Sequence, residues 1–272
     1  MGLDEALREL DLRVGLGDLT SEDQLESLLA IARQVEVPAG QILFEAGQPS
    51  SVIFQLVDGA VDVSGRVIER GLLGFADFVL ARPYADTAVT KAPSRLLQVD
   101  TADYREYLED NFELAYRIIT RTSETVSAHL DPARLGSVAS PGTVSFASVE
   151  IPIVERLMMF SRMRVFRNAS MQALANLAQL ATETRFAAGT EIVALGSRPS
   201  VVSFLVEGSV ELAAPGGARA IRSARDLLAH AMELALDLEH DRRREDLIDL
   251  LEQHFDLTMA LLGFLVTEQE AV

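Results

Sequence analysis

Short runs of apolar, often β-branched residues alternate with glycines between about residues 37 and 99. Runs of this kind, bounded by glycine, are typical of strands that are joined by tight turns. The pattern returns in the second half of the chain, where three glycines recur 149 positions after their counterparts. The matching pairs are Gly40 and Gly189, Gly47 and Gly196, and Gly59 and Gly208. A gapless repeat of this length predicts a duplicated, strand-rich domain.

Helical patterns flank the first run of strands. Residues 20–23, with the sequence Thr-Ser-Glu-Asp, form a good helix start before a leucine-rich stretch. A second helix is predicted from a cap at Thr101–Asp103 to about Leu130. Its apolar positions lie three and four residues apart, which is the spacing of a helix-packing seam. Packing within its own domain and a helix–helix dimer or interdomain contact both fit this seam. Its interface candidates are Leu108, Phe112, Ile119 and Val126.

The second half of the chain opens with a helical pattern that contains methionines. Residues 131–149 are rich in Ser, Pro, Gly and Ala and predict a linker. A helix is then predicted over residues 151–166. Its methionines are Met158, Met159 and Met163. Methionines on a helix are most often flexible core residues, although they also form adaptable partner surfaces.

The second repeat is shorter than the first. Leu108–Ala115 and Leu251–Thr258 correspond at an offset of 143, so six residues are missing from the second repeat. The shortened interval contains Arg225–Leu238, a helix-favouring segment without turn residues. We therefore expect a strand-depleted second β-roll whose open edges are covered by a helix or by a partner. The interface candidates in this half are Leu228, Phe255 and Leu262.

Length and composition favour two domains. The chain has 272 residues, 49% of them hydrophobic, and the repeat favours two domains over one large core. The predicted boundaries are residues 1–130 for the first domain, 131–149 for the linker and 150–272 for the second domain. No apolar stretch reaches the length of a membrane span and the N-terminus has no signal pattern. We therefore expect a cytoplasmic protein that does not insert into a membrane.

The composition also argues against several kinds of chemistry. The chain has no cysteine, which rules out disulfides, thiolate metal sites and cysteine nucleophiles. A net charge of −17 would repel a phosphate backbone, so we do not expect a nucleic-acid partner. Common catalytic motifs are missing, and Glu239–Asp241 with His254 fits surface charge better than a metal site. We therefore expect a non-enzymatic protein with no metal and no cofactor.

The order of elements resembles the cyclic nucleotide-binding domain of the catabolite activator family and of the regulatory subunits of cyclic-AMP-dependent kinase. In that family helices precede glycine-punctuated strands, and a long helix follows them. The resemblance covers residues 20–130 well and residues 165–270 in part. It implies an α+β protein of two β-roll (double-stranded jelly-roll) domains with flanking N- and C-terminal helices, the second domain being strand-depleted.

The family's phosphate-binding cassette has a counterpart here. The cassette has the form Gly-Glu-Leu-Ala, followed by Pro-Arg-x-Ala-Thr. In this chain Gly-Phe-Ala-Asp at residues 74–77 leads to Pro-Tyr-Ala-Asp-Thr at residues 83–87, with glycine, proline and threonine in the family's places. The resemblance implies a degenerate ligand site whose residues are Gly74, Phe75, Ala76, Asp77, Arg82, Tyr84 and Thr87.

Both polar anchors of the family's cassette are replaced. The glutamate that binds the ribose hydroxyl corresponds to Phe75, and the arginine that neutralises the cyclic phosphate corresponds to Tyr84. A hydrogen bond to a charged group is worth about 1.5–3 kcal/mol, so losing two weakens binding by roughly 3–6 kcal/mol. Arg82 is the only nearby cation in the sequence that could compensate. Asp77 and Asp86 would add repulsion if they face the pocket.

These patterns predict a non-enzymatic regulatory or scaffolding protein that does not bind cyclic AMP and acts through a protein partner, a homodimer or both. The alternative is a sensor of a cyclic nucleotide or another small ligand in the first β-roll, which would regulate a partner protein. Phe75 and Tyr84 distinguish the two hypotheses. Aromatic side chains that fill the roll imply a closed core, whereas aromatic side chains that line a void imply a new ligand.

Overall fold

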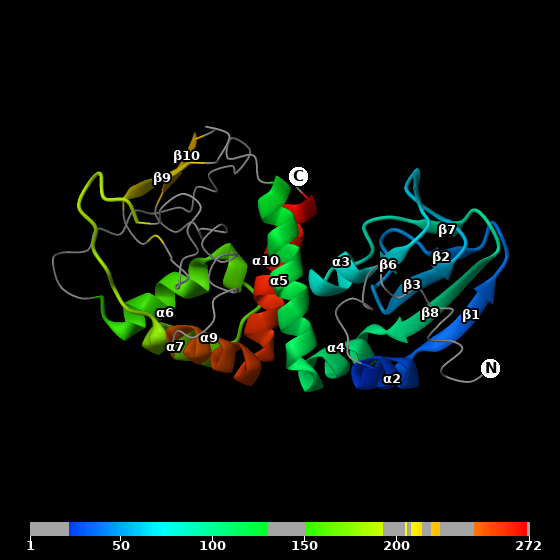
Figure 1. The fold of residues 1–272 in the computed structure, drawn as a ribbon, viewed down its shortest axis with the longest axis horizontal. Coiled ribbons are helices and arrows are strands. Elements are labelled where there is room, and N and C mark those ends of the chain that lie inside the picture. The colour runs from blue at the N-terminus through cyan, green and yellow to red at the C-terminus, as the bar shows by residue number, and fades with distance from the viewer. Residues whose placement is uncertain are drawn as a thin grey trace. The chain divides into compact units, whose positions relative to one another are not determined.

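A computed structural model describes residues 22–129, 151–192, 205, 208–213, 219–223 and 242–270. The chain forms two compact units, Met1–Ile118 (unit 1) and Ile119–Val272 (unit 2). Each is an arrangement of helices and antiparallel strands (Figure 1), so the predicted α+β class is confirmed. The predicted linker at 131–149 lies outside the described residues, and the predicted domain boundaries stay a prediction.

Unit 1 contains two antiparallel four-stranded sheets. The first has the strand order β1-β8-β3-β6 and the second has the order β2-β7-β4-β5. The strands are β1 (Arg33–Val37), β2 (Ile42–Phe44), β3 (Val52–Asp58), β4 (Val61–Val63), β5 (Arg66–Ile68), β6 (Gly71–Leu73), β7 (Ala88–Thr90) and β8 (Ser94–Asp100). The glycine-punctuated apolar runs are therefore strands, as the sequence predicts.

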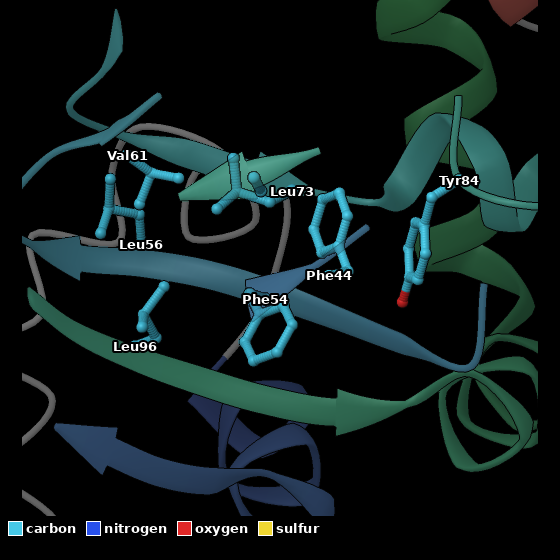
Figure 2. Packing of buried hydrophobic residues seen from close by; sticks show 8 residues of the cluster. Phe44, Phe54, Leu56, Val61, Leu73, Tyr84 and Leu96 are labelled. Carbon is cyan, nitrogen blue, oxygen red and sulfur yellow. The ribbon is translucent and has the colours of Figure 1, made fainter. Parts of the chain in front are cut away.

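One cluster of apolar side chains from both sheets forms the interior of this roll. Phe54 and Leu56 both belong to this cluster, because alternate side chains of a strand such as β3 point to the same side. Figure 2 shows the aromatic rings gathered at one end of the cluster and the aliphatic side chains at the other. The buried members are Phe44, Phe54, Leu56, Val61, Leu73, Tyr84, Ala88 and Leu96.

Gly59 occupies a turn that no other residue fits. Its φ angle is +106°, and a Cβ atom there would lie 2.3 Å from the Oγ atom and 2.7 Å from the Cα atom of Ser94. Ser94 is held in place because its Oγ atom donates a hydrogen bond to the carbonyl of Ala92, at 2.8 Å. The corresponding glycine of the second repeat, Gly208, also has a positive φ, of 89°.

We expect Gly59→Ala to lower the free energy of unfolding by roughly 1–3 kcal/mol, because backbone strain and overpacking combine at this position. Gly40→Ala is a matched control, since Gly40 has a φ of +82° but nothing within 4 Å of an added Cβ. Urea unfolding followed by far-UV circular dichroism measures both. Equal losses in the two variants would contradict the contact with Ser94.

Three described helices accompany the sheets of unit 1: α2 (Glu22–Ile31), α3 (Phe75–Val79) and α4 (Thr101–Asp110). Helix α2 begins inside the predicted start and packs against α4, where the hydroxyl of Tyr107 donates a hydrogen bond to the carbonyl of Gln24 at 2.6 Å. Burial raises the pKa of Tyr107 to about 12. Helix α4 is therefore tied to α2 as well as to its own sheet.

The helix predicted from 101 to 130 is wrong as a single helix. It is divided into α4 and α5 (Phe112–His129) at Asn111, whose φ and ψ angles are −119° and 58°. The Tyr107 carbonyl accepts two hydrogen bonds at this break, from the Asn111 side-chain amide at 2.8 Å and from the Asn111 backbone amide at 3.0 Å. The predicted cap also differs, because the N-cap residue is Asp100 and its side chain makes no capping hydrogen bond.

Unit 2 is described mainly as helices. They are α6 (Ile153–Arg162), a 3-10 turn η1 (Arg164–Phe166), α7 (Met171–Leu180), α9 (Arg242–Gln253) and α10 (Phe255–Glu270). A described two-stranded antiparallel sheet joins β9 (Ser209–Ala213) and β10 (Arg219–Ser223). The predicted single helix over 151–166 is interrupted at Met163, which is extended. A second β-roll stays a prediction, and the predicted covering helix at 225–238 lies outside the described residues.

Helix α10 forms the apolar centre of unit 2. It contacts η1, α7 and α9, and apolar side chains around its whole circumference are buried. A helix that is hydrophobic on all sides is stable only when other elements surround it. The buried residues include the predicted interface candidates Phe255 and Leu262, together with Leu257, Met259, Ala260, Leu261, Leu265 and Val266.

Candidate functional site: the cassette of the first roll

The cassette begins at Gly74, between β6 and α3. Gly74 has a φ of +80° and is the N-cap of α3, and its carbonyl accepts a hydrogen bond from the Phe78 amide at 3.1 Å. A Cβ atom on Gly74 would lie 3.0 Å from the Tyr84 ring and 3.1 Å from the Val52 carbonyl oxygen. Glycine is therefore required both by the backbone conformation and by the close approach of Tyr84.

Tyr84, in the place of the family's phosphate-binding arginine, points into the roll. Its side chain is only 4% exposed, and its ring stacks on Phe44 with a centroid distance of 4.0 Å and an interplanar angle of 15°. Figure 2 shows this ring beside Phe44 and near Phe54, at the end of the apolar cluster. The side chain therefore belongs to the core of the roll.

The hydroxyl of Tyr84 binds the backbone at the start of β3. It donates a hydrogen bond to the Val52 carbonyl at 2.6 Å and accepts one from the Val52 amide at 3.0 Å. Burial of the ring is the main cause that raises the pKa of Tyr84 above its ordinary value. Tyr84 is consequently a neutral side chain that satisfies one buried donor and one acceptor of its own fold.

The backbone of Tyr84 is held by the loop between β2 and β3. Its amide donates to the Gln48 carbonyl at 2.9 Å, and its carbonyl accepts from the Gly47 amide at 2.8 Å. Thr87, the cassette threonine, accepts a hydrogen bond at its Oγ1 atom from the Ala46 amide at 3.0 Å. These bonds fix residues 84–87 against residues 46–48.

Asp77 and Arg82 pair with each other. The Nε atom of Arg82 lies 2.7 Å from the Oδ1 atom of Asp77, and the amide of Arg82 donates to the Asp77 carbonyl at 3.0 Å. Asp77 is buried, so this partner compensates a carboxylate that would otherwise be costly to remove from water. The nearest cation of the cassette is therefore already engaged by the nearest carboxylate, while Asp86 is exposed.

Phe75, in the place of the family's ribose-binding glutamate, packs toward α4 instead of lying beside Tyr84. Its ring meets those of Phe78 and Tyr104 at 6.2 and 6.4 Å. Phe78 also contacts Tyr104, in an edge-to-face geometry at 5.7 Å. We call Phe75, Phe78 and Tyr104 the aromatic cluster. Burial raises the pKa of the Tyr104 hydroxyl, which has no hydrogen-bond partner in the described structure.

The predicted site residues thus fall into three places. Gly74 and Tyr84 meet at the end of the roll, Asp77 and Arg82 pair on and just after α3, and Phe75 contacts α4. The Ala76 carbonyl accepts the hydrogen bond of the Leu80 amide at the end of α3. Sequence reasoning missed Phe44, Val52 and Tyr104, which complete these contacts. Phe44 is marked only by the short run Ile-Leu-Phe, and nothing in the sequence marks a backbone partner such as Val52.

The predicted interface candidates differ in exposure. Leu108, Ile119, Phe255 and Leu262 are buried within a single chain, whereas Phe112 is half-buried. The side chain of Val126 and the whole of Leu228 lie outside the described residues. A role for any of them in an interface stays a prediction.

Three further structural observations bear on function. Within the described part of the chain, no helix combines the length and the apolar character that a membrane crossing requires. In the same residues no group of three or more His, Asp or Glu side chains is arranged to hold a metal ion. His254 was considered from the sequence as a possible metal ligand together with residues 239–241. Its Nε2 atom lies 2.8 Å from the Nδ2 atom of Asn176. Residues 239–241 lie outside the description.

Comparison with known proteins gives matches in structure. No protein-family model matches the chain, and no curated protein matches its sequence. The sensor domain of the transcriptional regulator DNR from Pseudomonas aeruginosa is 22% identical, over 53% of this chain and 98% of that chain, with a TM-score of 0.42. A cyclic nucleotide-binding-like protein from Brucella abortus is 22% identical, over 39% of this chain and 99% of that chain, with a TM-score of 0.33.

A third match spans more of the chain. The regulatory domain of Toxoplasma gondii PKA, solved with cAMP, is 13% identical over 84% of this chain and 81% of that chain, with a TM-score of 0.38. The ligand preference of the cassette is inferred from the residues of this chain and not from these matches. The solved structures that this chain matches thus include a cyclic nucleotide-binding-like protein and a regulatory domain solved with cAMP.

Proposed function

We propose that this chain is a non-enzymatic regulatory or scaffolding protein whose first β-roll is closed by its own Tyr84 and does not bind cyclic AMP or cyclic GMP. The observation that carries the proposal is the position of Tyr84. Its ring is part of the roll's core, and its hydroxyl is bonded to Val52. The protein acts through contacts with other proteins.

Charge supports the closed roll. A cyclic phosphate needs a cation or several aligned donors, because its charge is otherwise expensive to remove from water. Tyr84 is neutral and offers one hydroxyl, whose proton is already donated to the Val52 carbonyl. To reach a phosphate, Arg82 would have to leave the buried carboxylate of Asp77 without its partner. The free energy lost at Asp77 would be about as large as the free energy gained at the phosphate.

The aromatic cluster supports a role that does not depend on a nucleotide. Phe75 and Phe78 of α3 contact Tyr104 of α4 through ring pairs, each worth about 0.5–1.5 kcal/mol beyond the area they bury. The cassette helix is thereby attached to the helix that follows the roll without any ligand between them. A helix α4 that contacts α3 without a ligand suits a scaffold better than a ligand-operated switch.

Calorimetric titration of the full chain tests the proposal. We expect no heat of binding for cyclic AMP or cyclic GMP at micromolar concentrations, because the missing anchors and the filled roll together remove more than the roughly 3–6 kcal/mol of the two polar contacts. Micromolar binding would overturn the closed roll and would favour the sensor hypothesis.

A double variant provides the positive control. Phe75→Glu with Tyr84→Arg removes the Tyr84 ring from the core and restores both anchors, so it should bind cyclic AMP more tightly than either single variant. Circular dichroism establishes that each variant is folded. If a folded double variant also fails to bind, the roll is closed by more than Tyr84, and the single-residue explanation is wrong.

A further inference from the structure

Helix α6 of unit 2 exposes apolar side chains on one side. Val154 is 68% exposed and Met158 is 46% exposed, and their spacing of four residues places them on the same face of the helix. Ile153, just before them, is 51% exposed, but it lies seven residues before Phe160 and therefore on the other side of the helix. That side is buried at Phe160, and α6 packs against α7. Val154 and Met158 are the large apolar side chains that this face of the ten-residue helix exposes, and they mark an interaction surface.

Two charged residues bound this exposed face. Glu155 lies in the first turn of α6 and Arg162 in the last turn, and both are exposed. They are seven residues apart, or about two helical turns, so they lie on the same side with Met158 between them. Neither forms an ion pair with another residue of the described structure. We name Val154, Glu155, Met158 and Arg162 the α6 face.

This arrangement is self-complementary. When two copies of α6 lie antiparallel about a two-fold axis near Met158, each Glu155 is opposite the Arg162 of the other copy, and the two methionines meet at the centre. Because of the two-fold axis, the contact between Glu155 of one copy and Arg162 of the other occurs twice in the dimer. A parallel arrangement would instead place Glu155 beside Glu155 and Arg162 beside Arg162, which is unfavourable. We infer that the α6 face is a homodimer interface in which two copies of the chain pair antiparallel through α6.

The one acidic and one basic residue of the α6 face favour a second copy over a lipid surface. A chain with a net charge of −17 is repelled by anionic membranes, and the α6 face has one positive and one negative residue and hence no net charge. The face is small, because a helix of ten residues is about 15 Å long. Contacts that bury less than about 1,200 Å² are weak and transient. We therefore expect a dissociation constant of the dimer in the micromolar range. It should be measured at physiological salt, so that repulsion between the two acidic chains is screened.

Sedimentation velocity of the full chain over a concentration series tests the inference. We expect a monomer–dimer equilibrium in the wild type. Met158→Glu should abolish it, and Arg162→Glu should weaken it about tenfold, because two like-charge contacts replace two opposite-charge contacts. The double variant Glu155→Arg, Arg162→Glu restores opposite charges and should recover dimerisation. Arg167→Glu is the matched control, because it makes the same charge change at an exposed arginine outside α6.

Crosslinking tests the antiparallel register independently. The chain has no cysteine, so Met158→Cys introduces a single thiol that lies near the two-fold axis. A disulfide needs Cα atoms within about 7 Å, so mild oxidation should link Met158→Cys dimers much faster than Arg167→Cys dimers. Thermal melting of each variant separates loss of pairing from loss of folding.

Four outcomes would overturn the inference. They are a wild type that remains monomeric at every concentration, a folded Arg162→Glu variant that dimerises as well as the wild type, a charge-exchanged double variant that fails to recover, and equal crosslinking at positions 158 and 167. Co-sedimentation with anionic vesicles as a monomer would likewise overturn it and indicate a lipid surface. The inference does not depend on the closed roll of unit 1. It concerns α6 of unit 2, and its experiments measure dimerisation in the absence of any nucleotide.

Discussion

Replacing Tyr84 with alanine is expected to destabilise unit 1 by about 3–5 kcal/mol, the usual cost of removing a buried aromatic side chain from a core. The stack on Phe44 disappears, and the Val52 amide and carbonyl lose their partner. Gly74 also loses the ring that approaches its backbone. Because the chain contains no tryptophan, far-UV circular dichroism during urea unfolding is the suitable measurement.

Tyr84→Phe is the matched control for this result. It keeps the ring against Phe44 and removes only the hydroxyl, so the expected loss is about 1–3 kcal/mol from the unsatisfied Val52 groups. The difference between the two variants measures the packing of the ring. A Tyr84→Ala variant as stable as the wild type would show that the ring does not fill the roll, and it would remove the main support for the proposed function.

Replacing Ile119 with glutamate is expected to have an effect of similar size, several kcal/mol, since a carboxylate would enter a fully buried position without a partner. Ile119 lies in α5 and is 0% exposed within a single chain, as is Ala115 on the same seam. We therefore expect the loss of unfolding free energy to be independent of protein concentration. Thermal unfolding at two widely separated concentrations measures this.

Ile119→Val serves as the conservative control, with an expected loss of about 0.5–1.5 kcal/mol. If the Ile119→Glu variant is less stable than the wild type only at high protein concentration, where the wild type associates, the seam is an interface between chains, as one of the two sequence-based alternatives holds. If the variant is as stable as the wild type, the seam is exposed to solvent and the burial of Ile119 is wrong.

The strands and the turns of unit 1 could be predicted from the sequence because their signals are local. A glycine at Gly59 or Gly74 is needed for a positive φ, and the alternating apolar runs determine which residues face the roll. The start of α2 at Glu22 could be predicted for the same reason, whereas the cap predicted at Thr101–Asp103 is wrong, because the N-cap residue of α4 is Asp100. The break at Asn111 was not predicted, because the three-and-four spacing of apolar residues continues across it from Leu108 to Phe112.

The resemblance of the sequence to the cassette predicts that Phe75 and Tyr84 replace two polar anchors, but the positions of these two aromatic side chains could not be predicted from it. Phe75 and Tyr84 look alike as substitutions, yet Tyr84 enters the core of the roll and Phe75 contacts α4. The position of Tyr84 depends on the hydrogen bonds of its hydroxyl to Val52, and the position of Phe75 depends on its ring contact with Tyr104. Both partners are distant along the chain. Such contacts carry no periodic signal.

The sequence alone therefore determined the α+β class and the glycine turns of the first unit, because both depend on residue identity at local spacing. The tertiary structure alone decided which side of each element is covered. Helix α6 and the extended Met163 that follows it show this most clearly, since their apolar pattern does not reveal which side packs against α7. Burial depends on the neighbours that the fold supplies, and those neighbours leave Met158 exposed and Met163 buried.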